Sequence, residues 1–305
     1  MSTTMQQDPN ALYGYVPTFW VCVIFVTLFA ALTVLHAIQA LFFKPRLYWI
    51  LPTIVLCGAA ETVGWQRSFS IGYIYYSVSL IKQLYRPVLT YSLSMISCTI
   101  LAPVFLTAAL YAILGKVISI VGDKYSRLKA RAYVKIFLIA DTISLFVQGG
   151  RGGLSASAST VALSKIRTYV TLDGIIFQLV SILCYSVLAT EVAYRLAYNK
   201  PHVRNQEDRD VRRASGLPTN IFLMMLSLGI ATTLVFVRSV YRAIELGDGY
   251  AGTIIRTQVW FNVFDALPMT IIMFTLNILS PVFLLRNPEV FVTKPDSVYK
   301  LNNMT

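Results

Sequence analysis

The chain has 305 residues, of which 56% are hydrophobic and only 13% are charged, and its formal net charge is +12. A soluble domain carries roughly a quarter charged residues, so this composition excludes an ordinary soluble enzyme, a disordered chain and a free nucleic-acid-binding protein. The remaining class is a polytopic membrane protein, in which most Lys and Arg residues stand between apolar stretches and set the topology.

Seven apolar stretches are long enough to cross a bilayer, which takes about 20 helical residues. In chain order they cover residues 16–43, 47–65, 87–115, 132–150, 169–190, 217–237 and 257–285. Inside hydrocarbon, a helix satisfies every backbone polar group within its own segment. We therefore predict an all-α bundle of seven transmembrane helices that forms one membrane domain over residues 16–285.

The orientation follows from the positive charges. With the N-terminus outside, 17 of the 26 Lys and Arg residues fall on the inner side and nine on the outer side. This bias predicts an extracellular segment over residues 1–15 and a cytosolic tail over residues 286–305. Residues 1–15 contain no Lys or Arg, which favours a retained first span over a cleaved signal peptide. Residues 68–86 are predicted to form an outer loop or an interfacial helix.

Carboxylates occur inside four of the apolar stretches, and the one in the fifth stretch is Asp173, near its outer end. Glu61, Asp141 and Asp265 lie in the second, fourth and seventh stretches, respectively. Charges within membrane helices are costly, so such residues are candidates for function. The predicted topology places Glu61 and Asp265 in the outer half of the bundle and Asp141 near its midplane.

Two arginines follow the sixth stretch, and two glutamines lie in the fourth and fifth. Arg238 and Arg242 are four residues apart on one helix face, where like charges repel, and Glu245 is a nearby acidic partner. We expect an outward-opening polar cavity lined by helices 2, 4, 6 and 7. The alternative is a set of buried ion pairs that fixes helix packing without a ligand. Gln148 and Gln178 line the cavity in the first case or bond between helices in the second.

Other chemistry has little support in the sequence. The chain has two histidines, His36 and His202, so a three-histidine zinc site is impossible and a Ser-His-Asp arrangement is disfavoured. The last stretch contains no lysine that could carry retinal. The glycine-rich run 148–153 follows a membrane helix, and we interpret it as a hinge or a close-packed turn. We expect no catalytic residues, no metal and no cofactor.

Several of the polar residues stand in short motifs, and the resemblance that these motifs carry spans roughly residues 13–290. The motifs are Glu-Thr-Val-Gly-Trp at 61–65, Ala-Pro at 102–103, the set Phe137, Asp141, Ser144 and Gln148, and the blocks 238–245 and 264–269. Together these motifs resemble the fungal RTA-like family of lipid-translocating exporters. The chain departs from the family pattern in the last helix, at Thr257, Gln258, Asn262 and Ser280.

The resemblance implies a membrane protein that translocates or exports amphipathic lipids or lipid-like toxic compounds and so gives resistance to them. Sphingoid-base-like, sterol-like and porphyrin-like compounds are the implied ligands, and the plasma membrane is the implied location. The residues expected to bind such a ligand are Glu61, Asp141, Gln148, Gln178, Arg238, Arg242, Glu245 and Asp265. The alternative function is a seven-helix receptor or sensor that signals to a cytosolic partner through the basic loops 116–131 and 195–213.

Overall fold

The computed structural model describes residues 17–44, 47–77, 85–122, 125–154, 161–198, 200, 218–248 and 252–285. These residues form helices joined by turns, with no strand among them, so the all-α prediction is confirmed. The predicted terminal segments 1–15 and 286–305 lie outside the described residues, as does most of the basic loop 195–213.

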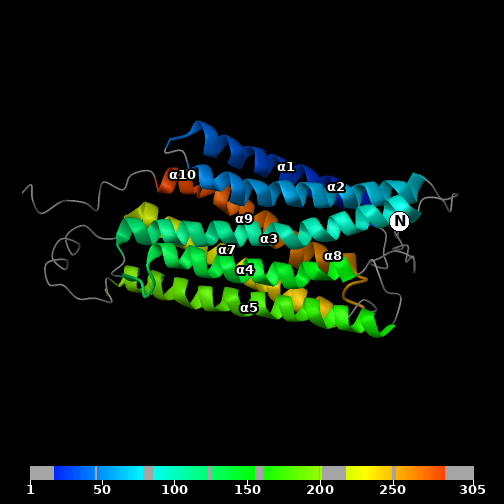
Figure 1. Cartoon of the computed structure of the whole chain (residues 1–305). Coiled ribbons are helices and arrows are strands. Elements are labelled where there is room, and N and C mark those ends of the chain that lie inside the picture. The colour runs from blue at the N-terminus through cyan, green and yellow to red at the C-terminus, as the bar shows by residue number, and fades with distance from the viewer. Residues whose placement is uncertain are drawn as a thin grey trace, which may run out of the picture.

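Seven long helical segments lie side by side along the described chain, and their directions alternate (Figure 1). They are α1 (Phe19–Phe42); η1 (Tyr48–Ile50), η2 (Leu51–Val55) and α2 (Leu56–Ser77); α3 (Tyr85–Val121); α4 (Ala130–Leu154); α5 (Val161–Ala197); α7 (Thr219–Gly247); and α8 (Gln258–Phe261), η5 (Asn262–Ala266), α9 (Leu267–Ile278) and α10 (Pro281–Leu284). Consecutive segments contact each other, and α9 packs against both α1 and α7.

Five of these segments are long and apolar enough to cross a membrane. They are Phe19–Phe42, Cys98–Val121, Leu172–Ala197, Thr219–Gly247 and Gln258–Leu284. The helices α2 and α4 are more polar and fall outside this set. Both are packed between apolar neighbours, α2 between α1 and α3 and α4 between α3 and α5. The structure therefore supports a multi-pass membrane protein.

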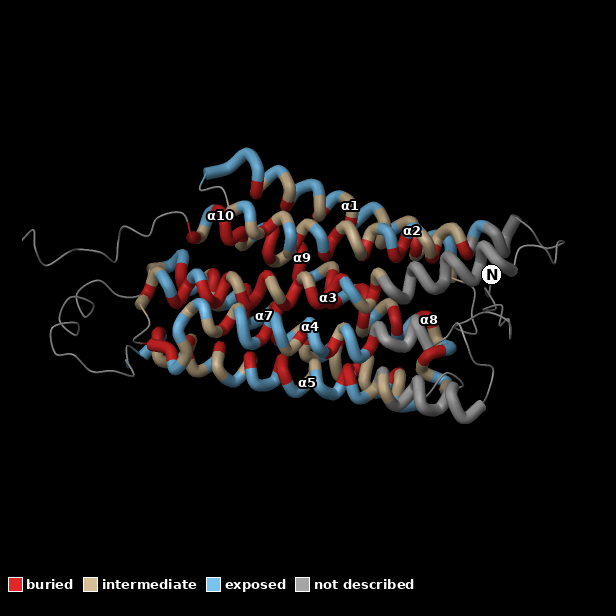
Figure 2. The backbone as a smooth tube through the Cα atoms, in the orientation of Figure 1, coloured by how far each residue is buried: buried red, intermediate tan, exposed pale blue. Residues whose placement is uncertain are grey.

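The buried residues lie on the helix faces that point into the bundle (Figure 2), and many of the exposed residues are large and apolar. The central helix is α3, in which 67% of the most apolar stretch is buried, against 22% in α1. Large apolar residues such as Trp20, Ile139 and Phe146 are exposed, whereas Glu61 and Asp141 are each only 1% exposed. A lipid environment favours this arrangement, because apolar surface is solvated by acyl chains and charges are not.

Three helices are longer than the sequence suggested. The helix α2 continues to Ser77, so residues 68–77 extend it rather than form a separate loop or interfacial helix. The helix α4 runs through the glycine-rich run to Leu154, which corrects the predicted hinge or turn. The helix α7 reaches Gly247, ten residues beyond the predicted end of the sixth stretch. Helix continuation keeps the backbone hydrogen bonded, and within a packed bundle this outweighs the low helix propensity of glycine.

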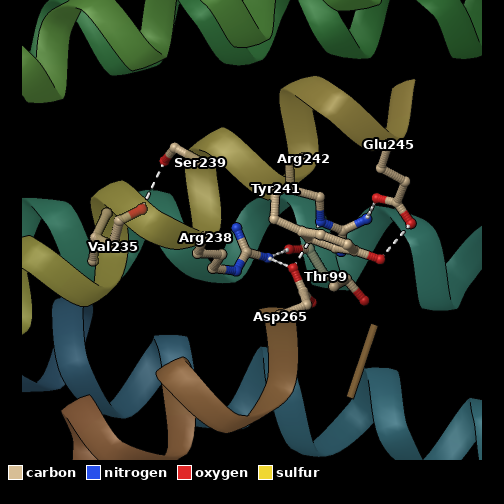
Figure 3. Close-up of polar contacts among 8 residues, drawn as sticks. All are labelled: Thr99, Val235, Arg238, Ser239, Tyr241, Arg242, Glu245 and Asp265. Atoms are coloured by element: carbon tan, nitrogen blue, oxygen red, sulfur yellow. Dashed lines mark hydrogen bonds and ion pairs between the residues drawn. The ribbon is translucent and has the colours of Figure 1, made fainter. Parts of the chain in front are cut away.

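The last helical segment is interrupted. The short helix α8 passes into the π-helical turn η5, and α9 begins with Pro268 in its first turn. A π turn accommodates an extra residue and shifts the side chains that follow it, and such turns are frequent at functional sites. In this chain the turn η5 contains Asp265 and directs it towards α7 (Figure 3).

Candidate functional site

Asp265 lies between two arginines of α7. Its Oδ1 atom accepts a hydrogen bond from Nε of Arg242 at 2.7 Å, and Nη2 of Arg238 lies 2.9 Å from the same oxygen (Figure 3). The two arginines are one helical turn apart and would repel each other without a shared anion. The carboxylate therefore stabilises a pair of like charges that one helix face brings together.

Three further residues extend this contact. Nη1 of Arg242 donates to Oε2 of Glu245 at 3.0 Å, and the hydroxyl of Tyr241 donates to Oε1 of Glu245 at 3.2 Å. On the other side, Nη2 of Arg238 donates to the main-chain oxygen of Thr99 in α3 at 3.0 Å. We call this group, formed by Thr99, Arg238, Tyr241, Arg242, Glu245 and Asp265, the ion-pair network.

The network is almost completely removed from solvent. The side chains of Asp265 and Glu245 are each 2% exposed, that of Arg238 is 6% exposed and that of Arg242 is 12% exposed. Buried ions of this kind persist only when they are paired and hydrogen bonded. The local partnership of Arg242 with Glu245 is confirmed, and these four residues form the buried ion pairs that were the alternative to an open polar cavity.

Glu61 adds a third carboxylate from α2. It is 1% exposed and interacts electrostatically with Asp265, Arg238 and Arg242, and the side chain of Trp65 is a hydrogen-bond partner. Its Oε1 atom is buried without a hydrogen-bond partner. Glu61, Glu245 and Asp265 together supply three negative charges when ionised, and Arg238 and Arg242 supply two positive charges. The group has one acidic residue in excess, and Glu61 retains a free acceptor.

Asp141 belongs to a different contact, between α3 and α4. Its Oδ2 atom accepts hydrogen bonds from the hydroxyls of Thr107 at 2.5 Å and Tyr111 at 2.9 Å, and its Oδ1 atom has no partner. The ring of Tyr111 packs at 4.7 Å, between centroids, against that of Tyr185 from α5. None of these contacts joins Asp141 to Arg238 or Arg242. Asp141 therefore belongs to a different group of contacts from Asp265.

The two glutamines bond between α4 and α5. Nε2 of Gln148 donates to the hydroxyl of Ser144 at 2.8 Å and to Oε1 of Gln178 at 3.2 Å. Ser144 in turn donates to the main-chain oxygen of Gly174 at 2.5 Å. Of the two roles that the sequence left open for Gln148 and Gln178, the structure shows the interhelical hydrogen bond.

Two cavities open beside α7. The larger, of about 610 Å³, lies between α7, the turn before α8, and the α8–η5 segment, and its wall includes Tyr241 of the ion-pair network. The smaller, of about 290 Å³, lies between α5 and α7. Neither of these two cavities is lined by Glu61, Asp141 or Asp265, and both have mainly apolar walls, so the polar cavity expected around these acids stays a prediction.

The larger cavity is a feature that the sequence reasoning missed. Its wall consists of apolar and aromatic side chains such as Val240, Ile244, Trp260 and Phe264. In a membrane helix such residues have the same pattern as residues that simply face lipid, so the sequence alone carries no signal that separates them. The family blocks 238–245 and 264–269, which supply three of these four, mark the region without revealing the space. Among the described residues, no group of three His, Cys, Asp or Glu side chains is placed to hold a metal ion.

The family model for RTA1-like proteins matches residues 68–288. The sphingoid long-chain base transporter RSB1 of Saccharomyces cerevisiae is 27% identical over 301 residues, covering 90% of this chain and 75% of that protein. Protoporphyrin uptake protein 1 of the same species is 22% identical over 313 residues, covering 91% of this chain and 94% of that protein.

A third relative in the same species, protein RTM1, is 25% identical over 171 residues, covering 56% of this chain and 51% of that protein. No solved structure gives a significant match. Two of the three names describe transport or uptake, and none describes a receptor or an enzyme.

Proposed function

This chain belongs to the RTA1-like family, and we propose that it binds amphipathic, lipid-like compounds within the membrane and translocates or exports them, with resistance as the consequence. The relatives named for long-chain bases and for protoporphyrin support membrane transport of lipid-like molecules as the general role. The ligand-binding residues proposed here are Glu61, Arg238, Arg242, Glu245 and Asp265, together with Asp141 between α3 and α4 and with Gln148 and Gln178 between α4 and α5.

One observation supports a particular class of ligand. The ion-pair network and Glu61 contain one acidic residue more than basic residues, and Oε1 of Glu61 lacks a partner. A buried carboxylate is stabilised by an ammonium group that donates hydrogen bonds to it. A sphingoid base carries a primary amine, which is positively charged near neutral pH. We therefore propose a long-chain base as the ligand and the acids, Glu61 first, as the acceptors of its amine.

The proposed topology keeps all seven helical segments as membrane spans. Several polar side chains of α2 and α4, among them Glu61 and Asp141, are buried against neighbouring helices, which allows these two helices to cross the bilayer inside a bundle. The N-terminus is proposed to lie outside and the C-terminus in the cytosol, because of the distribution of Lys and Arg. In this orientation the ion-pair network lies in the outer half of the membrane, and we propose the plasma membrane as the location.

The test is transport by the purified protein in vesicles. A fluorescent sphingoid base, its uncharged N-acylated form and protoporphyrin are each added to protein-containing and protein-free vesicles, and movement between leaflets is followed by quenching. We expect faster movement of the free base alone, with loss of that acceleration in Glu61→Gln, Asp141→Asn and Asp265→Asn at equal protein content. The exposed residue Asp173 provides a matched control, Asp173→Asn.

Two results would contradict the proposal. Equal acceleration of the N-acylated form would show that the amine is not recognised. Unchanged transport in all three acidic variants would show that these carboxylates do not accept it.

A further inference from the structure

The larger cavity is a groove that opens on the side of the bundle. Four residues of α7 face two aromatic residues of the last segment across it: Val237, Val240, Tyr241, Ile244, Trp260 and Phe264. Several of these side chains are partly exposed, Ile244 by 54% and Trp260 by 48%. In a membrane, this exposed side faces acyl chains, so the groove is reached laterally from the bilayer.

Tyr241 connects this groove to the ion-pair network. Its ring forms part of the groove wall and stacks on the ring of Phe264, with centroids 5.8 Å apart and an angle of 19° between the planes. Its hydroxyl donates to Oε1 of Glu245 at 3.2 Å (Figure 3). This distance is longer than is usual for a hydrogen bond between a hydroxyl and an oxygen acceptor. One side chain therefore separates an apolar space from a buried carboxylate.

We propose that the groove between α7 and the α8–η5 segment binds the hydrocarbon chain of a single-chain amphiphile that enters sideways from the bilayer, with its polar head at Tyr241 and Glu245. This inference rests on the proposed function and adds the site and the route of entry, on which the head meets Glu245 before it reaches Glu61. The ligand expected there is an alkyl chain that ends in a cationic head able to donate hydrogen bonds.

The size and charge of the site fit this occupant. A volume of about 610 Å³ lies in the range of roughly 300–1,000 Å³ that is usual for small-molecule sites. At roughly 30 Å³ for a group the size of water, it holds about twenty methylene groups, which suits one chain rather than two. The head then meets the buried carboxylate of Glu245, which is complementary to a cationic hydrogen-bond donor.

The experiment is photolabelling of the full-length protein in vesicles. The probe is a sphingoid base with a diazirine in its alkyl chain, and labelled residues are located by mass spectrometry. We expect labels on α7 and on the α8–η5 segment around Val240, Ile244 and Phe264. The variant Val240→Trp fills the groove and should remove these labels. Val237→Trp, at the lipid-facing rim of the groove, is the replacement test if Val240→Trp does not fold.

A matched control lies on the same helix. Ile230 is 38% exposed, as is Val237, and stands seven residues earlier, outside the groove. Ile230→Trp should therefore keep the labels. Labels spread evenly over lipid-facing helices, or concentrated in the cavity between α5 and α7, would overturn the inference, and so would undiminished labelling in both groove variants.

The same vesicles separate this inference from the proposed function. Groove labelling without accelerated transport by the wild-type protein would leave the groove as a binding site and refute the transport role. Accelerated transport that is unaffected by Val240→Trp and Val237→Trp would leave the transport role in place and refute the groove.

Discussion

Arg242 and Asp265 lie 23 residues apart in the chain, and Nε of the first donates to Oδ1 of the second at 2.7 Å. The contact joins α7 to the π turn η5, and Arg238 reaches the same oxygen from the preceding turn of α7. Asp265 is therefore the point at which the last helical segment is attached electrostatically to the rest of the bundle. A substitution of Asp265 therefore affects both arginines at once.

The variant Asp265→Asn should destabilise the fold. It leaves Arg238 and Arg242 close together without the anion that they share, and breaking a buried pair in this way costs about 3–5 kcal/mol. We expect a clear fall in the melting temperature of the detergent-solubilised protein. Asp173→Asn changes an exposed aspartate and should shift stability by less than about 0.5 kcal/mol. Equal melting temperatures for the two variants would show that the ion pairs contribute nothing to the fold.

The variant Glu61→Gln should behave differently, because its Oε1 atom has no partner in the structure. The substitution replaces a buried carboxyl group while preserving its shape, so we expect the melting temperature to be retained or raised. Transport of a sphingoid base should nevertheless be lost, as measured in the vesicle assay. A melting temperature as low as that of Asp265→Asn would instead identify Glu61 as a structural partner of the arginines.

The variant Thr107→Val tests the contact around Asp141. It removes the donor to Oδ2 and leaves a buried carboxylate with fewer hydrogen bonds, at a cost of about 1–3 kcal/mol. Thr142→Val is the matched control on α4, since Thr142 is exposed and its hydroxyl donates to the main-chain oxygen of Leu138 in its own helix. Chemical or thermal unfolding in detergent measures both. An equal loss of stability would mean that Thr107 acts only through its own helix.

Two glycines should respond in opposite directions to alanine. A Cβ atom on Gly58 would lie 2.0 Å from Oγ1 of Thr33 and 2.6 Å from Cε of Met273, where α1, α2 and α9 meet. Gly58→Ala should therefore cost about 1–3 kcal/mol. Gly229 in α7 has open space around such an atom, and Gly229→Ala should stabilise the helix by about 0.5–1 kcal/mol. Melting temperatures that move in the same direction would contradict the close approach at Gly58.

Much of the fold and some of the site could be predicted from the chain alone. Long apolar stretches predict helices, because a helix is the way in which one segment satisfies its own backbone in hydrocarbon. The pairing of Arg242 with Glu245 could be predicted because the two residues are three apart in one helix. The bounds of α2, α4 and α7 could not, since polar helical turns such as those around Arg238 resemble loops in a hydropathy pattern.

The composition and periodicity of this chain are sufficient to specify a multi-pass helical protein, because burial of backbone groups in lipid is a local requirement that each segment meets alone. The contacts of its polar residues are not specified in this local way. Whether Asp265 faces the arginines, whether Asp141 joins them or turns to Thr107 and Tyr111, and whether Val240 faces lipid or a groove depend on how the helices are rotated and offset against each other. Those rotations are set by packing between residues far apart in the chain, such as Gly58 against Met273, so only the assembled bundle determines them.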